Sequence, residues 1–128
     1  MKLNHLDLQV SDVPRAAALF EELLGLELQS NRASPAIAIM TDGDGFTLVL
    51  QRRKGESETY PEGFHFGFLV PDVETVVAFQ AKARGRALDV SDVIENGRGT
   101  LVYWRALDGI TVEVSCHRRT MGRRGAGG

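Results

Sequence analysis

The feature that most constrains the fold of this chain is an internal repeat. The segment NHLDLQVSDV at residues 4–13 matches FHFGFLVPDV at residues 64–73, at a shift of 60 positions. Further along, DGFTLV at residues 44–49 matches DGITVE at residues 108–113, at a shift of 64 positions. Two matches in the same order indicate that one unit of structure occurs twice. The change of shift means that the second copy has gained four residues, which we place in the loop at residues 96–99.

Each copy is predicted to contain one strand, one helix and then three strands. Apolar and polar residues alternate in the opening strand of the first copy, as expected of a sheet that is buried on one side. The apolar positions are Leu6, Leu8 and Val10, and the polar positions are His5, Asp7 and Gln9. In the second copy Phe64, Phe66 and Phe68 alternate with His65, Gly67 and Leu69. The pattern predicts an α+β fold.

Helix signals follow each opening strand directly. In the first copy Ser11 or Asp12 can cap the helix, Pro14 suits its first turn, and Gly25 can adopt the left-handed conformation that ends it. An apolar stripe is predicted at Phe20, Leu23 and Leu24. In the second copy we expect Asp72 to cap the helix, Gly85 to end it, and three residues to face inward, namely Val76, Val77 and Phe79.

A chain of 128 residues is the size of one domain. We expect a single domain over residues 1–117, with module one at about 1–54 and module two at about 63–117. Residues 118–128 are rich in glycine and arginine, and we expect a disordered basic tail. With one cysteine, Cys116, and no run of apolar residues long enough for a signal peptide or a membrane span, a cytoplasmic protein is expected.

The charge distribution argues against nucleic acid or membranes as partners. The chain has 15 basic and 17 acidic residues, but four of the arginines lie in the last eleven positions, which hold no acid. The body of the chain is therefore acidic. A nucleic-acid-binding protein would show a basic face, so a small-molecule partner is expected.

Three polar side chains are predicted to share one face of the sheet. His5 and His65 occupy equivalent positions in the two copies, on the face opposite the helices. Glu113 alternates with apolar neighbours in the last strand, so its carboxylate points the same way. Two imidazoles and a carboxylate suit one divalent metal ion, either Fe, Mn, Ni or Zn, and leave positions open for a substrate. The counterpart of Glu113 in the first copy is Val49, which cannot bind a metal.

Taken singly, each of these residues would be ordinary on a surface strand. It is the repeat that joins them into a candidate site.

These residues resemble the vicinal oxygen chelate superfamily, which includes glyoxalase I, extradiol dioxygenases, fosfomycin-modifying thiol transferases and bleomycin-binding proteins. The resemblance covers roughly residues 3–116. It rests on LNHLDLQVSDV at residues 3–13, on His65 before VPDV, and on Asp108-Gly109 followed by Glu113. It implies paired βαβββ modules that form a curved, cup-shaped mixed sheet, with helices on the outer face and a metal ion in the cup. It also implies a homodimer.

Departures from the family pattern help to choose among its activities. Glyoxalase I and the methylmalonyl-CoA epimerases, which also belong to this superfamily, place a fourth ligand where this chain has Val49. The ring-cleaving dioxygenases and the fosfomycin transferases resemble this chain in using three ligands, and both have a tyrosine ten residues before the glutamate, as Tyr103 is here. Its phenol could orient or protonate an anionic oxygen. The transferases carry a hydroxyl where this chain has Asp7, which would repel a phosphonate.

Our leading hypothesis is a metalloenzyme that acts on a small molecule with vicinal oxygens, with dioxygenase-like chemistry slightly favoured. His5, His65 and Glu113 would hold the metal, and Tyr103 would be catalytic. Candidates for substrate binding are Asp7, Trp104 and His117. The alternatives are a thiol transferase or lyase of the same superfamily, a resistance-type protein that binds a small molecule without turnover, and a structural dimer with a vestigial site.

Overall fold

A computed structural model describes residues 1–118 and divides the chain into two compact units. Module one is Met1–Tyr60, and module two begins at Pro61. Of the predicted basic tail, only Arg118 lies within the described residues, and 119–128 lie outside them. In the described part of the chain, neither helix has the length and hydrophobicity needed to cross a membrane.

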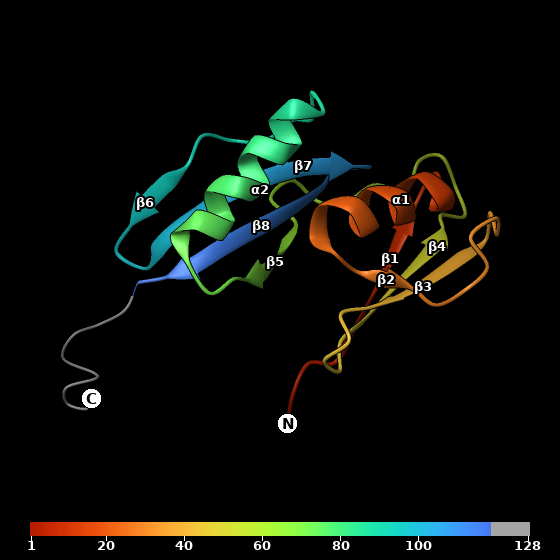
Figure 1. The fold of residues 1–128 in the computed structure, drawn as a ribbon. Helices are drawn as coiled ribbons and strands as arrows, with labels where there is room; N and C mark the ends of the chain where they lie inside the picture. The colour runs from red at the N-terminus through yellow and green to blue at the C-terminus, as the bar shows by residue number, and fades with distance from the viewer. Residues whose placement is uncertain (119–128) are drawn as a thin grey trace. The chain divides into compact units, whose positions relative to one another are not determined.

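Module one contains one helix and a four-stranded mixed sheet (Figure 1). Its elements are β1 (His5–Val10), α1 (Val13–Leu24), β2 (Glu27–Leu28), β3 (Ile37–Thr41) and β4 (Thr47–Arg52). The strand order is β1-β4-β3-β2. The first and last strands pair in parallel, whereas the other neighbours are antiparallel.

Module two repeats this plan, with α2 lying across one face of the sheet (Figure 1). Its elements are β5 (His65–Leu69), α2 (Val73–Gly85), β6 (Ile94–Asn96), β7 (Gly99–Leu107) and β8 (Ile110–His117). The strand order is β5-β8-β7-β6, and again the first and last strands are parallel. The predicted α+β class and the paired βαβββ modules are confirmed.

The helix of module one has the predicted ends. The Asp12 carboxylate accepts a hydrogen bond from the backbone N–H of Arg15 at 3.1 Å, which satisfies one of the free donors of the first turn. Gly25 ends the helix at φ 72°, a left-handed conformation that costs glycine little. Leu24 is half-buried, and the fully covered part of the stripe is formed by Phe20 and Leu23.

Two details predicted for the second helix were wrong. Gly85 was expected to follow the helix in a left-handed conformation, as Gly25 does, but it is the last helical residue. The residue in the left-handed conformation is Ala87, at φ 58°. Val77 is 44% exposed, because the face that packs on the sheet follows the helical spacing of Val76 and Ala83. Val77 lies off that stripe.

The core of module two lies between α2 and the sheet. Trp104 and Val112 are fully buried there, and the ring of Phe79 from α2 meets the Trp104 ring edge-on at 6.1 Å between centroids. Alternate residues of β7 and β8 point into this core, so the intervening residues lie on the opposite, polar face of the sheet.

The predicted place of the four inserted residues was half right. Leu28 pairs with Met40 in module one, and Val90 forms the equivalent bridge with Trp104 in module two. The shift between the copies is therefore already 62 at Val90, and it reaches 64 at Trp104. Two residues enter directly after α2, and two more lengthen the β6–β7 hairpin.

The cap of α2 predicts a pH dependence of stability. The Asp72 carboxylate accepts hydrogen bonds from the hydroxyl of Thr75 at 2.6 Å and from its backbone N–H at 2.9 Å, and these bonds lower the Asp72 pKa below its ordinary value. A lowered pKa stabilises the fold above the unfolded-state pKa, and this stabilisation is lost as pH falls through the folded-state pKa. We expect Asp72→Asn to lower the unfolding free energy at pH 7, and the deficit to shrink between about pH 4 and pH 2.

Urea unfolding of the wild type and the variant across this range measures the effect. The control is Asp89→Asn, an exposed aspartate of the same module whose carboxylate has no hydrogen bond to any residue within 1–118. An Asp72→Asn deficit that is the same at pH 7 and at pH 2.5 would contradict the assignment.

Candidate functional site

The polar face of module two brings three of the predicted site residues together. His65 comes from β5, Tyr103 from β7 and Glu113 from β8. Glu113 is the direct partner of Tyr103 in the antiparallel ladder and of Gly67 in the parallel ladder. The two ladders therefore place Glu113 between the strands that carry His65 and Tyr103.

The imidazole of His65 is oriented by the turn that precedes β5. Its Nδ1 lies 2.9 Å from the backbone oxygen of Gly63. A carbonyl oxygen can only accept, so Nδ1 carries a proton, and in the neutral ring Nε2 holds the lone pair. Nε2 lies 3.9 Å from Oε1 of Glu113. This arrangement, in which one ring nitrogen donates to a backbone oxygen and the other is free, is the one found in histidines that bind metals.

The separation of these two atoms fits a shared cation. Two ligand atoms at about 2.1 Å from one ion are about 3.0 Å apart at a right angle and about 4.2 Å apart at opposite positions. The 3.9 Å between Nε2 of His65 and Oε1 of Glu113 lies within this range. The side chains are 48% and 25% exposed, so an ion could reach both from solvent.

Gly67 makes room for the Glu113 side chain. A Cβ atom at position 67 would lie 3.2 Å from both Cβ and the backbone oxygen of Glu113, which is closer than most real contacts. Because Gly67 has no side chain, the glutamate can lie against the neighbouring strand, beside His65. The glycine is therefore part of the site's construction.

Tyr103 packs its ring edge-on against the ring of His65, with 5.9 Å between centroids and an interplanar angle of 88°. It is half-buried, and its backbone is held by two hydrogen bonds with Ser91. No described residue hydrogen-bonds its phenol hydroxyl. The hydroxyl is therefore free to act on a bound molecule.

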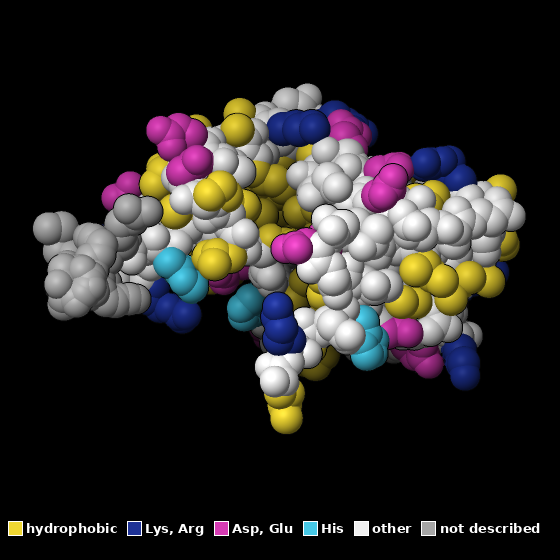
Figure 2. Space-filling view, turned by 60° about the horizontal axis from the view of Figure 1, so that its bottom comes forward, with side chains coloured by type: hydrophobic (Ala, Val, Ile, Leu, Met, Phe, Trp, Pro, Cys, Tyr) yellow, Lys and Arg dark blue, Asp and Glu magenta, His cyan; other side chains and the backbone are white. Residues whose placement is uncertain are grey.

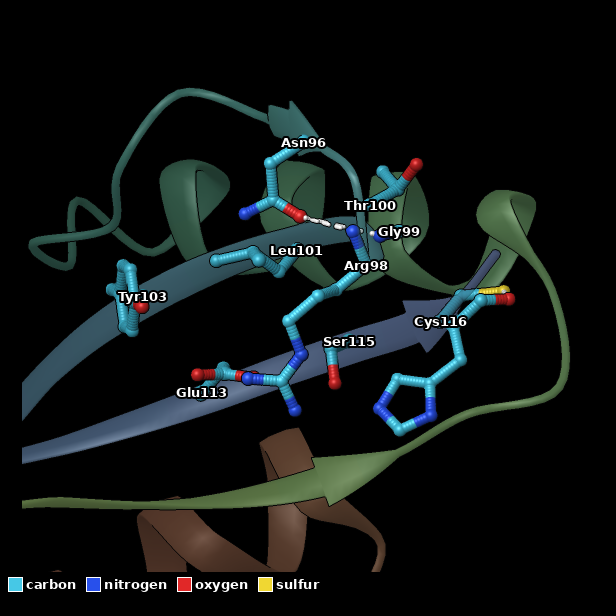
Figure 3. A pocket seen from close by; sticks show the side chains of 10 residues that line it. Asn96, Arg98, Gly99, Thr100, Leu101, Tyr103, Glu113, Ser115 and Cys116 are labelled. Atoms are coloured by element: carbon cyan, nitrogen blue, oxygen red, sulfur yellow. Dashed lines mark hydrogen bonds between the residues drawn. The ribbon is translucent and has the colours of Figure 1, made fainter. Parts of the chain in front are cut away.

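A small open pocket of about 90 Å³ lies beside Glu113 (Figure 3). Its lining includes Tyr103, Ser115 and the hairpin between β6 and β7. Drug-sized ligands occupy pockets of about 300–1,000 Å³. This pocket alone would therefore enclose only part of such a ligand.

In module one, His5 lies on the polar face of β1 and is exposed. Its Nδ1 is 2.8 Å from the side-chain oxygen of Asn4, so in the neutral ring Nε2 is again the nitrogen with the lone pair. Figure 2 shows histidine side chains at the surface of the molecule. Within residues 1–118, no group of three or more His, Cys, Asp or Glu side chains is placed to hold a metal ion. The three-ligand set stays a prediction.

Asp7 is held by two amides on the same face of module one. Its Oδ1 accepts a hydrogen bond from Gln9 at 3.2 Å, and its Oδ2 accepts one from Gln51 at 2.6 Å. Asp7 pairs with Val49 in the parallel ladder, as Gly67 pairs with Glu113 in module two. In module one the carboxylate thus stands on the first strand instead of the last.

The remaining candidates lie in different environments. Trp104 is fully buried against α2, on the opposite face of β7 from Tyr103, so the structure places it in the core rather than at the site. His117 is exposed at the end of β8 and lines the pocket beside Glu113. Cys116 is a half-buried free thiol.

Sequence reasoning missed two residues that shape this region. Arg98 lies at the tip of the β6–β7 hairpin and lines the pocket. Tyr60 fixes β1, because its hydroxyl accepts from the Gln9 N–H at 2.7 Å and donates to the Gln9 carbonyl at 2.9 Å. The NGRG segment at residues 96–99 signalled a turn with a cation at its tip, but nothing in the sequence linked Tyr60 to β1.

The duplicated βαβββ architecture agrees with comparisons to known proteins. The Glyoxalase/Bleomycin resistance protein/Dioxygenase superfamily matches residues 2–114. The chain belongs to this superfamily. A comparison with curated protein sequences found no match.

Solved structures of the superfamily share this fold. A possible glyoxalase from Bacillus cereus is 33% identical, with a TM-score of 0.79, over 91% of this chain and 99% of that one. A lactoylglutathione lyase from Agrobacterium tumefaciens is 20% identical, with a TM-score of 0.72, over 90% and 92%. The fosfomycin resistance protein FosX from Listeria monocytogenes, solved with Mn(II) and sulfate, is 18% identical, with a TM-score of 0.73, over 96% and 94%.

The close approach at Gly67 predicts a mutational effect. Gly67→Ala would place a Cβ at 3.2 Å from Glu113 and force the ladder or the glutamate to shift. We expect a loss of about 1–3 kcal/mol of unfolding free energy, measured by denaturant unfolding. The matched control is Gly85→Ala, where a Cβ has nothing within 4 Å. It should leave stability unchanged or raise it by up to about 1 kcal/mol. Equal stability of the two variants would contradict this account of Gly67.

Proposed function

We propose that this protein is a metal-dependent enzyme acting on a small molecule that binds a divalent metal through vicinal oxygens, with dioxygenase-like chemistry favoured. The observation that carries the proposal is the pairing of His65 and Glu113. A proton-bearing Nδ1 fixed on a backbone oxygen leaves Nε2 free, 3.9 Å from a carboxylate oxygen. Membership of the superfamily supports it.

His65 and Glu113 would hold the metal together with His5 from module one. His5 supports this role, because its Nδ1 is also engaged and its Nε2 is free. The donor set of two neutral imidazoles and one carboxylate fits Fe, Mn, Ni or Zn. When bound, such an ion supplies Lewis-acid chemistry that favours the ionised form of a substrate hydroxyl.

Tyr103 would orient the substrate and move a proton. Its position beside Glu113 in the ladder and against His65 keeps its ring near both proposed ligands. Its hydroxyl can donate to an anionic oxygen of the substrate or accept a proton from it. Asp7, held by its two glutamines, would accept hydrogen bonds from substrate hydroxyls. His117 would contact the substrate at the far end of the pocket.

Two alternatives keep specific support. A lyase or thiol transferase would use the same three ligands, and the superfamily includes both resistance proteins and glyoxalases. A binding protein without turnover would hold a small molecule on the same polar face, and the superfamily includes resistance proteins. A homodimer is proposed because the sheets end in the open edge strands β2 and β6, which can pair with another chain.

Metal binding tests the proposal directly. We expect the wild type to bind Mn²⁺, and His5→Ala, His65→Ala and Glu113→Gln each to bind it at least about tenfold more weakly, since each removes one ligand. Titration calorimetry measures this. The control is His117→Ala, a histidine of the same sheet outside the set, which should bind Mn²⁺ normally. Unchanged affinity in His65→Ala would exclude the site.

Tyr103→Phe separates catalysis from metal binding. We expect Mn²⁺ affinity to stay within about twofold, because the phenol is not a ligand. Turnover of a catechol probe should fall by about 100-fold or more, because a positioned proton donor is lost. Absorbance changes of the probe measure turnover. A variant with the full wild-type rate would show that the phenol plays no part in proton transfer. Binding of the probe without turnover, unaffected by chelators, would favour the binding protein.

A further inference from the structure

The positively charged side chain of Arg98 lies over the pocket beside Glu113. Arg98 lies at the tip of the β6–β7 hairpin, and its side chain extends from the hairpin toward Glu113 and Ser115 (Figure 3). All of these residues belong to module two, so their arrangement is set within one compact unit. No step of the proposed chemistry uses this arginine.

The backbone that carries Arg98 is firmly held. The Asn96 side-chain oxygen accepts from the N–H groups of Arg98 at 2.9 Å and Gly99 at 3.3 Å. Arg118 donates to the backbone oxygens of Arg98 at 2.7 Å and Asn96 at 3.0 Å. Gly99 has φ 149°, and a Cβ there would lie 2.0 Å from the Cys116 oxygen, so only glycine fits. The hairpin therefore presents Arg98 from a fixed position.

The guanidinium of Arg98 forms no hydrogen bond or ion pair with any described residue. Other arginines of the chain have acidic partners, such as Arg32 with Glu21 and Arg84 with Asp92, each at 2.7 Å. Arg98 thus keeps all of its donors available at the pocket. The hydroxyls of Tyr103 and Ser115 line the same pocket and are also without a partner among the described residues.

This combination of groups suits an anion. A guanidinium presents two parallel N–H donors that match the two oxygens of a carboxylate, and hydroxyls can donate to either oxygen. Glu113 opposes anion binding in the metal-free protein. A divalent cation on Glu113 would reverse the local charge, so the metal and the anion should support each other's binding.

We propose that Arg98 forms a carboxylate-binding subsite, and that the substrate is a small carboxylated molecule whose vicinal oxygens bind the metal. The inference rests on the proposed function for the metal, but the subsite itself needs only module two. In the metal-free protein a carboxylate is favoured over a phosphonate, because Glu113 repels a single negative charge less than a double one.

The test compares two chelating probes that differ by one carboxylate, catechol and 3,4-dihydroxybenzoate. We expect the Mn²⁺-loaded wild type to bind 3,4-dihydroxybenzoate about 3- to 10-fold more tightly than catechol, the range for a partly exposed charged pair. Arg98→Gln should remove this preference and leave catechol affinity and Mn²⁺ affinity unchanged. Equal binding of the two probes by the wild type would overturn the proposal.

The matched control is Arg105→Gln. Arg105 is an exposed arginine on β7 that shares the polar face with Tyr103 but lies outside this pocket. The Arg105→Gln variant loses the same charge from the same sheet. Because Arg105 lies outside the pocket, this variant should keep the preference for the carboxylate. If Arg105→Gln loses the preference as fully as Arg98→Gln does, general electrostatic attraction explains the binding and the subsite is excluded.

A metal-free experiment separates this inference from the proposed function. Benzoate is titrated into chelator-treated protein, and backbone amide signals of residues 96–101 and of Ser115 are followed by NMR. We expect saturable shifts in the wild type and in Arg105→Gln, and none in Arg98→Gln. Shifts that persist in Arg98→Gln would overturn the subsite. Failure of the protein to bind Mn²⁺, with the benzoate shifts intact, would overturn the metalloenzyme and leave the subsite standing.

Discussion

The parallel ladder between the first and last strands of each module is the constraint on which the candidate site depends. A strand alternates its side chains between two faces, so a shift of one residue in the pairing would turn every polar group toward the helix. The register that sets His65 opposite Thr111 and Gly67 opposite Glu113 places histidine and glutamate on the same face, two positions apart. Burial of Val112 and Val114 under α2 helps to fix that register, because a slip of one residue would expose them.

The two modules use this common ladder differently. At the same pair of positions, module one has Asp7 on its first strand and Val49 on its last, whereas module two has Gly67 and Glu113. A carboxylate thus occurs once in each module, on opposite strands. The absence of a side chain at Gly67 leaves room for a longer glutamate that reaches His65, whereas Asp7 is tied to two glutamine amides. Duplication kept the ladder, and the polar face then diverged.

Much of the fold could be predicted because the repeat and the alternation are properties of the sequence itself. The helix caps at Asp12 and Asp72 and the faces of β1 and β5 follow from local chemistry, and the structure has them. The end of α2 was mispredicted because glycine is permitted, not required, to end a helix. Ala87 takes the left-handed conformation there at a cost that the sequence does not display.

The candidate site was harder to predict because its details depend on contacts between distant residues. Parity along one strand placed His65 and Glu113 on one face, but only the ladder register shows how near Nε2 and Oε1 lie. Trp104 was expected at the site because an aromatic side chain can line a small-molecule binding site. Its neighbours in β7 show the opposite parity, and the structure puts it in the core. Arg98 drew no notice because its role depends on a hairpin closed by Asn96 and Arg118.

The hydrogen bonds of the two histidines determine which ring nitrogen can bind a cation. Each Nδ1 faces an oxygen that can only accept, a backbone carbonyl for His65 and an amide oxygen for His5. Each ring must therefore keep its lone pair on Nε2 while it is neutral. A histidine that served only as a surface donor would need no such orientation at both equivalent positions of a duplicated unit. If the two rings bind a cation as proposed, this orientation would aim each ring before the ion arrives, so that little ordering would be needed on binding.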